Sequence, residues 1–205
     1  MSPRPRTVSD EEILAAAGAV VARLGPTRFT LAHVAKEVGL SPATLVQRFG
    51  TKRGLLLALA RSGVEGVKEC FAAVRGAHRS PLAALLSAAT EMTRHVKSPE
   101  ELANFLSFLQ VDLSDAEFHR LSLENSKRIH AGYGALLDEA VASGEIAPCD
   151  TKALARAVGA VAGGSLLGWA IHRDGPAEKW VRADLATLLD PYRAGGPVRA
   201  RRRSR

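Results

Sequence analysis

The sequence predicts an all-α protein, and three observations carry this prediction. Helix-start signals recur along the chain, in which a hydroxyl residue precedes a proline or lies three positions before a glutamate. Glycines follow at positions where a residue with a left-handed backbone would end each helix. Apolar residues repeat every three to four positions, whereas no run alternates as a strand does. About nine helices are expected.

The helix starts follow from these signals in order along the chain. Capping boxes of the form S-x-x-E predict starts at Ser9, Ser98 and Ser114. Proline at the first helical position, where its missing N–H costs nothing, predicts starts at Ser41-Pro42, Ser80-Pro81 and Ser98-Pro99. Two more starts are indicated by Asp150 and by Gly175-Pro176.

Four glycines are expected to end helices: Gly25, Gly39, Gly76 and Gly144. Together with the starts, they predict helices over residues 9–24, 30–38, 41–49, 51–75, 80–96, 99–112, 114–143, 150–173 and 176–192. The eighth helix is apolar nearly all round and rich in glycine, so we expect it to be buried on most sides.

The composition favours a soluble cytoplasmic protein. Hydrophobic residues make up 46% of the 205 residues, enough for a core without disulfides. The two cysteines, Cys70 and Cys149, lack zinc-type spacing and suit a reducing compartment. The polar start carries no secretory signal, and the longest apolar stretch, residues 157–171, is shorter than the roughly twenty residues a membrane span needs.

The positive charge is concentrated at the two ends of the chain. Residues 1–54 hold eight Lys/Arg against four Asp/Glu, and residues 193–205 hold six against none. Residues 55–192 hold fourteen Lys/Arg against seventeen Asp/Glu and are therefore mildly acidic. A cationic terminal part beside an acidic body is typical of a polyanion-binding module joined to a separate interaction domain.

The stretch "GLSPATLVQRFGTKRGLL", from Gly39, completes a predicted helix-turn-helix. Gly39 would provide the tight turn, and Ala35 would face the second helix where a larger side chain would push the pair apart. The shared core would consist of Val34, Val38, Leu45 and Phe49. The outer face of the second helix is small and polar at its N-terminal end, which suits insertion into a major groove of DNA.

The order of these residues resembles the N-terminal domain of the TetR family of transcriptional regulators. The resemblance covers roughly residues 10–58, and its matching positions are Ala16, Gly25, Thr30, Val34-Ala35, Gly39, Ser41, Leu45, Phe49, Lys52 and Leu55-Leu56. It implies a homodimeric repressor that binds a palindromic DNA operator and is released by a small molecule bound to its C-terminal helices.

The resemblance also implies individual DNA contacts. Thr30 would contact a phosphate from the start of the second helix and Lys52 another from the start of the fourth, while the residues after Ser41 would read bases. With the outer face of the second helix of the motif, the expected DNA-binding residues are Thr30, Ser41, Pro42, Ala43, Thr44, Val46, Gln47, Arg48 and Lys52.

One position departs from the family pattern. The family usually has tyrosine after the leucine of the third helix, and this chain has Val46. Two interpretations remain open: either Arg48 and Arg53 replace the lost phosphate contact, or the valine packs against a thymine methyl group.

The chain is therefore expected to divide into a DNA-binding domain at residues 1–54, with a basic N-terminal arm, and a helical effector-binding and dimerisation domain at residues 55–192. Residues 193–205 form a basic tail expected to be disordered, either attracted to polyanions or without a role. The arm "SPRPRT" is either a minor-groove contact or a solvated segment. By the resemblance, the homodimer would form through the helices at 150–173 and 176–192.

An effector pocket would lie among the fourth to eighth helices and be mostly apolar. The candidate side chains, for each of which ordinary core packing is an alternative, are Met92, Phe105, Phe108, Leu109, His130, Tyr133 and Trp169. The middle of the chain shows no cluster of titratable residues, so a neutral or apolar effector is expected.

Three other classes of protein are alternatives to a ligand-controlled DNA-binding regulator. An enzyme is disfavoured because "GGSLLG" lacks the G-x-S-x-G spacing and the six histidines form no metal-binding pair, so no cofactor and no metal are expected. A ligand-independent DNA-binding protein of weak specificity would rely mainly on the basic ends. An effector-binding module that has lost DNA binding is suggested only by Val46.

Overall fold

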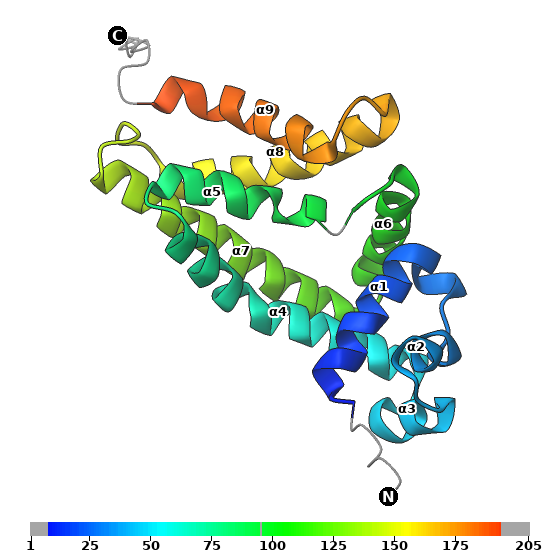
Figure 1. Ribbon diagram of the computed structural model, residues 1–205. Coiled ribbons are helices and arrows are strands. Elements are labelled where there is room, and N and C mark those ends of the chain that lie inside the picture. Colours follow the sequence, from blue (N-terminus) through cyan, green and yellow to red (C-terminus); the bar gives the residue numbers. More distant parts are fainter. Residues whose placement is uncertain (1–7, 95, 194–205) are drawn as a thin grey trace, which may run out of the picture. The chain divides into compact units, whose positions relative to one another are not determined.

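The computed structural model describes residues 8–94 and 96–193. In this part of the chain the fold is all-helical (Figure 1). The α-helices are α1 (Asp10–Arg28), α2 (Leu31–Val38), α3 (Pro42–Phe49), α4 (Lys52–Ala77), α5 (Pro81–Thr90), α6 (Pro99–Ser114), α7 (Ala116–Ala142), α8 (Thr151–His172) and α9 (Ala177–Leu189). Two short 3-10 helices are η1 (Glu91–Arg94) and η2 (Asp190–Tyr192). An isolated bridge between Ile146 and Arg193 is the sole extended pairing in the described residues.

The chain divides into two compact units. Unit 1 comprises Met1–Gly66 and Glu100–Asn125, and unit 2 comprises Val67–Pro99 and Ser126–Arg205. Helices α1 to α3, most of α6 and the first parts of α4 and α7 belong to unit 1. The predicted division at residues 54/55 follows the expected DNA-binding motif and remains a prediction. The predicted basic arm and tail fall in residues 1–7 and 194–205, outside the described residues.

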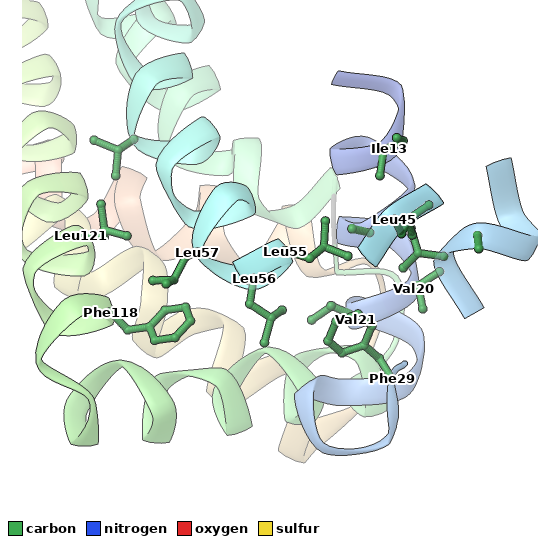
Figure 2. Packing of buried hydrophobic residues seen from close by; sticks show 14 residues of the cluster. Ile13, Val20, Val21, Phe29, Leu45, Leu55, Leu56, Leu57, Phe118 and Leu121 are labelled. Atoms are coloured by element: carbon green, nitrogen blue, oxygen red, sulfur yellow. The ribbon is translucent and has the colours of Figure 1, made fainter. Parts of the chain in front are cut away.

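The core of unit 1 joins the three N-terminal helices to the starts of α4 and α7. Figure 2 shows Ile13, Val20 and Leu45 close together, with the leucines of α4 lying between α1 and Phe118 of α7. Phe29, Leu45 and Leu55 are fully buried. Each fully buried Leu or Phe contributes about 1.5–3 kcal/mol relative to exposure. This burial holds α2 and α3 against α1 and α4.

Most predicted starts and stops of helices are confirmed. The Ser9 capping box is complete, Asp150 caps α8, and Pro42 and Pro81 begin their helices. Gly39 and Gly144 have the expected positive φ of 70° and 74°.

Three details of the predicted helices are wrong. Gly76 does not end its helix, because α4 continues to Ala77 without a left-handed residue. Ser114 does not cap α7, since its hydroxyl donates to carbonyls of α6 and the carboxylate of Asp115 accepts the first N–H groups of α7. The helix predicted over 80–96 remains α-helical only to Thr90 and tightens into η1.

Helix α1 breaks at Gly25, as the sequence predicts, and then makes one more turn. Gly25 has φ 73° and ψ 162°, a region that in practice only glycine adopts. The carbonyl of Ala22 would normally accept a hydrogen bond from the N–H of residue 26. Pro26 has no N–H, so that hydrogen bond cannot form. Asn104 of α6 supplies the replacement, donating from Nδ2 to the carbonyl oxygens of Ala22 at 2.8 Å and Arg23 at 3.0 Å. The α6 side chain therefore completes the end of α1.

Unit 2 is built from the ends of α4 and α7 together with α5, α8 and α9. Phe71 of α4 packs edge-on against Tyr133 of α7, with 5.4 Å between ring centroids. Helices α8 and α9 run alongside each other and both contact α5 (Figure 1). Gly168 of α8 allows this approach, because a Cβ there would lie 3.4 Å from Trp180 of α9.

Helix α8 is the one helix of the described residues that is long and apolar enough to cross a membrane. The core helices of soluble proteins meet the same criteria of length and composition. Here α8 packs on α5 and α9, and the hydroxyl of Ser165 donates to Asp184 of α9 at 2.6 Å. Its exposed side retains two large apolar side chains, Leu167 at 44% and Ile171 at 80% exposure.

The break in α1 generates a stability prediction. Gly25→Ala should lower the free energy of unfolding by about 3 kcal/mol, because φ is positive and the added Cβ would lie 2.7 Å from Oδ1 of Asn104. Gly39→Ala is the matched control, with φ 70° but no atom within 4 Å of the added Cβ, and should cost about 1 kcal/mol. Urea unfolding of both variants measures the difference, and equal losses would contradict the assigned contact.

Candidate nucleic-acid interface

Helices α2 and α3 form a closely packed pair. Gly39 ends α2, and the N–H of Leu40 donates to the carbonyl of Ala35 at 2.9 Å to close the turn. Ala35 and Leu45 are fully buried, while Val38 and Phe49 are half-buried at the edge of the same core. The predicted helix-turn-helix core is therefore present.

The outer face of α3 is exposed as predicted. The hydroxyl of Ser41 accepts the N–H of Thr44 at 3.1 Å, and the two hydroxyls lie 2.9 Å apart. Val46 is 50% exposed. Of the predicted base-reading positions only Thr44 is half-buried; the exposed ones are Ser41, Pro42, Ala43, Val46, Gln47 and Arg48. This face offers hydroxyl, amide and methyl groups.

Thr30 caps the start of α2, and Lys52 contacts the residues just before it. The hydroxyl of Thr30 accepts the N–H of His33 at 3.3 Å, and its own N–H donates to Nδ1 of that histidine at 3.2 Å. Nζ of Lys52 donates to the carbonyl of Thr27 at 2.9 Å and lies 4.8 Å from the ring centroid of Phe29. One exposed hydroxyl and one ammonium group are thus held beside the N-terminus of α2.

The two arginines that could replace the missing tyrosine are engaged elsewhere. Nη1 of Arg48 donates to the carbonyl of Val8 at 2.7 Å and to Asp10 at 3.2 Å. Nη2 of Arg53 donates to both carboxylate oxygens of Asp115 at 2.9 Å. Both guanidinium groups therefore have partners within the protein.

An ion cluster joins the start of α4 to the corner between α6 and α7. Glu117 accepts from Arg53 at 3.1 Å and from Arg61 at 2.7 Å, while Asp115 accepts from Arg53 and from the N–H groups of Glu117 and Phe118. The hydrogen bonds from Arg53 hold the pKa of Asp115 below its usual range. Those from Asp115 and Glu117 raise the pKa of Arg53. The N-terminus of α4 is thereby tied to α6.

Comparison with known proteins identifies the fold. The sequence model for bacterial regulatory proteins of the TetR family matches residues 13–59, and the model for the C-terminal part of BetI-type transcriptional repressors matches residues 79–192. The chain belongs to the TetR family. It is a transcription regulator with a helix-turn-helix DNA-binding domain and a C-terminal ligand-binding domain, as the resemblance implied.

Solved structures of the same fold support the assignment of the TetR architecture. A TetR transcription regulator from Haloarcula marismortui has a TM-score of 0.71 at 18% identity, with 90% of this chain and 97% of that chain covered. A transcriptional regulator from Saccharomonospora viridis in complex with choline has a TM-score of 0.70 at 18% identity, covering 88% and 94%. The regulator FadR from Bacillus subtilis in complex with stearoyl-CoA has a TM-score of 0.63 at 17% identity, with 88% of this chain and 98% of that chain covered. No curated protein sequence matches the chain.

The predicted effector residues of this TetR-family chain fall into two groups. In unit 1, Phe105 and Leu109 lie on α6 with 51% and 46% of their surface exposed, whereas Phe108 packs edge-on against Phe118. In unit 2, His130 approaches Gly159 of α8. Tyr133 is buried, which raises its pKa to about 12.

The last two candidates are also in unit 2. Trp169 is buried, and its indole N–H donates to the carbonyl of Gly175 at 3.0 Å. Met92 lies in η1. Core packing therefore accounts for Phe108, Tyr133 and Trp169, and the exposed apolar surface among the candidates lies on α6.

A groove in unit 2 was not anticipated. It has a volume of about 260 Å³, lies between α4, α5 and η1, and is lined by Cys70, Ala73, Val74, Ala77, His78, Ser87, Glu91 and Arg94. Burial raises the pKa of the Cys70 thiol.

The residues that tie α6 to the motif were also missed by sequence reasoning. Asn104 stands in the apolar run "LANFLSFL", and Pro26 leaves a carbonyl without its donor. Those two features together signal a polar contact, but they do not say which side chain meets which carbonyl.

The ion cluster generates a prediction on pH. Because the folded-state pKa of Asp115 is lowered, its contribution to stability is present above the unfolded pKa of about 3.9 and is lost as pH falls through the folded pKa. Asp115→Asn keeps an oxygen that can cap α7 but removes the charge. The wild-type protein should therefore lose its advantage in melting temperature over this variant between about pH 5 and pH 3. A constant difference across that range would show that the pair does not contribute.

Proposed function

We propose that this protein is a homodimeric repressor that binds a palindromic DNA operator and leaves it when a small, mostly apolar effector binds. The observation that carries the proposal is the exposed, small and polar face of α3, held by a fully buried core at the end of a tight Gly39 turn. Such a face fits the major groove, whose base edges present distinct patterns of donors, acceptors and methyl groups.

Each exposed group of this surface is assigned a role in the proposal. Thr44 and Gln47 hydrogen-bond to base edges, with Ser41, Pro42, Ala43 and Arg48 completing the inserted face, and Val46 packs on a thymine methyl group. Thr30 and Lys52 contact phosphates on either side of the α2 start, which the helix dipole also makes favourable for an anion. A hydroxyl and an ammonium group position the protein without reading sequence.

Helix α6 is the proposed carrier of the effector signal to the DNA-binding motif. Asn104 binds the broken end of α1, and Asp115, directly after α6, binds Arg53 at the start of α4. A shift of α6 must therefore move these partners or break their hydrogen bonds. The effector acts to the extent that it binds more tightly to the shifted state, in which α4 holds the recognition helices at the wrong separation.

The exposed apolar side chains of α6 suit an apolar effector. Phe105 and Leu109 lie one helical turn apart, and Leu113 follows at 69% exposure. The structurally similar regulators are bound to choline in one case and stearoyl-CoA in another, and the acyl chain of the second is the kind of ligand this surface would take. His130 and Met92 remain candidates within unit 2, whereas the buried Tyr133 and Trp169 belong to its core.

A homodimer is proposed through α8 and α9. On α8, the exposed residues Ala160, Gly164, Leu167 and Ile171 recur at spacings of four, three and four, which places them on one face. A Cβ at Gly163 or Gly164 would meet no atom within 4 Å, so a second helix can approach closely there. Dimerisation would also hold two recognition helices about 34 Å apart, the spacing of successive major grooves.

Membership of this family favours a binding protein over an enzyme and a cytoplasmic location, where operator DNA is found. No metal or cofactor is needed by the proposed mechanism. The two alternatives, weakly specific DNA binding and effector binding without DNA, are separated from the proposal by the first experiment below.

The proposed DNA readout predicts the outcome of a selection from randomised duplexes at near-physiological salt. The wild-type protein should enrich a palindrome, and Thr44→Ala and Gln47→Ala should each weaken binding to it by about 5- to 150-fold, because a good base contact is worth about 1–3 kcal/mol. Ser126→Ala, at an exposed position of α7, is the control and should bind normally. Binding that fades with salt and enriches no sequence would leave a weakly specific protein.

The proposed dimer predicts a change of mass on disruption of the α8 face. Ile171→Glu should convert the dimer to a monomer in sedimentation analysis, since a charge would be buried in the interface. Leu113→Glu places the same charge at a similarly exposed leucine of unit 1 and should leave the dimer intact. A monomeric wild-type protein, or equal effects of the two substitutions, would contradict the assigned face.

A further inference from the structure

The groove of unit 2 has one wall made of small, mostly apolar side chains. This wall lies on α4 and consists of Cys70, Ala73, Val74 and Ala77, whose spacing places them on one face of the helix. Ala73 and Ala77 are exposed, and their small side chains leave space that a larger residue would fill. His78 lies at the end of this wall, where its Nδ1 donates to the carbonyl of Val74 at 2.9 Å. The α4 side of the groove therefore offers methyl groups and one thiol.

The opposite wall carries polar groups on α5 and η1, namely Ser87, Glu91 and Arg94. Nη1 of Arg94 lies 3.3 Å from a carboxylate oxygen of Glu91. The carboxylate is the more enclosed partner, since 27% of the glutamate side chain is exposed against 69% of the arginine side chain. An ion pair with one well-exposed partner contributes little to stability, so Arg94 is free to turn towards a bound group.

Ser87 presents a hydroxyl without a partner to the same groove. The residue is 9% exposed, and within residues 8–94 and 96–193 its side-chain oxygen forms no hydrogen bond. No fully buried side-chain oxygen or nitrogen in that part of the chain lacks a partner, so this oxygen keeps its access to solvent through the groove. Polar groups buried to this degree are normally hydrogen-bonded. The hydroxyl is therefore available to a polar group of a ligand.

The charges in the groove favour a ligand that carries both signs. Burial raises the pKa of the Cys70 thiol, and the neighbouring Glu91 raises it further, so the thiol stays protonated at neutral pH and adds no negative charge. A purely anionic ligand would be repelled by Glu91, and a purely cationic ligand would be repelled by Arg94. A ligand with one ammonium and one carboxylate group can pair with both side chains.

We propose that this groove binds a small zwitterion, an α-amino acid with an aliphatic side chain. Glu91 accepts hydrogen bonds from the ammonium group, and the planar guanidinium of Arg94 matches the carboxylate. Ser87 provides a further hydrogen bond, and the aliphatic side chain packs on the methyl groups of α4. The volume of about 260 Å³ corresponds to about nine water molecules, which suits a ligand of roughly ten non-hydrogen atoms.

The site goes beyond the proposed function, because its residues are all in unit 2 and differ from those of α6 that are assigned to the apolar effector. Its ligand also belongs to a different chemical class. Binding to the groove can be measured without DNA, so the two proposals can fail independently.

Isothermal titration calorimetry on the full chain compares leucine with two analogues that each lack one charged group. 4-Methylpentanoate keeps the carboxylate and the carbon chain, whereas 3-methylbutylamine keeps the ammonium group and the carbon chain. Leucine should bind at least about tenfold more tightly than either, because a hydrogen bond to a charged group would be lost with each analogue. Glu91→Gln should remove the advantage of leucine over 4-methylpentanoate, and Arg94→Gln should remove its advantage over 3-methylbutylamine. Each substitution should weaken leucine binding by about 10- to 150-fold.

Two substitutions of neighbouring alanines on α4 locate the site. Ala73→Leu should abolish leucine binding, because a long side chain on a helix leans towards the preceding turn and would fill the groove beside Cys70. Ala72→Leu is the matched control, since Ala72 is also exposed but does not line the groove, and it should bind leucine as the wild type does. Leucine and alanine both favour a helix, so both variants should fold, and their melting temperatures check this.

Three results would overturn the inference. A wild-type protein whose dissociation constant for leucine exceeds about 10 mM would have no such site. An analogue that binds as tightly as leucine would show that only one charge is recognised. Equal leucine binding by the Ala72→Leu and Ala73→Leu variants would place the ligand outside the groove. Because the titration contains no DNA, each of these results leaves the proposed operator binding in place, and a failed DNA selection leaves this inference in place.

Discussion

The missing N–H of Pro26 is the constraint on which the DNA-binding unit depends. Next to the break of α1 at Gly25, it leaves the Ala22 carbonyl without a helical partner, which would be costly if that carbonyl were buried and unpaired. Gly25 supplies the backbone turn, and Asn104 supplies the donor from a helix some eighty residues later. A local rule of backbone chemistry thus creates a long-range contact, and that contact makes most of α6 part of the same compact unit as the helix-turn-helix.

The cations near the motif show how the same unit is prepared for DNA. Lys52 is held over Phe29 by the neutral carbonyl of Thr27, and within residues 8–94 and 96–193 no carboxylate forms a salt bridge with its ammonium group. Arg53 instead forms a paired cluster with Asp115 and Glu117, so its charge is largely neutralised within the protein. Under the proposed function Lys52 contacts a phosphate, whereas Arg53 has a structural role, although the two are adjacent in sequence. Their division of roles depends on which acceptors the fold brings near.

The sequence was sufficient for the local elements and insufficient for the contacts between them. Capping residues and glycines act within a few positions, so Ser9, Gly39 and Asp150 could be assigned correctly from their neighbours. The predicted cap of α7, Ser114, is wrong because Ser114 and Asp115 are both residue types that cap helices. Asp115 is the residue that caps α7, and it also pairs with Arg53. In the candidate site, the exposed face of α3 followed from its spacing, whereas the partners of Arg48 and Arg53 lie about forty to sixty positions away. Residue type alone indicates the seven effector candidates, and it does not distinguish the buried Tyr133 from the exposed Phe105.

The replacement of tyrosine by Val46 changes how specificity must be distributed. A tyrosine at this place contributes a phosphate contact, which positions the helix without reading bases, whereas a valine can contribute only apolar contact and so depends on thymine. The affinity that a tyrosine would gain from the DNA phosphate backbone must come from other residues. Arg53 does not supply it, because it is paired with Asp115 and Glu117. Nη1 of Arg48 donates to the Val8 carbonyl and to Asp10, so this arginine also holds α3 to the residues at the start of α1.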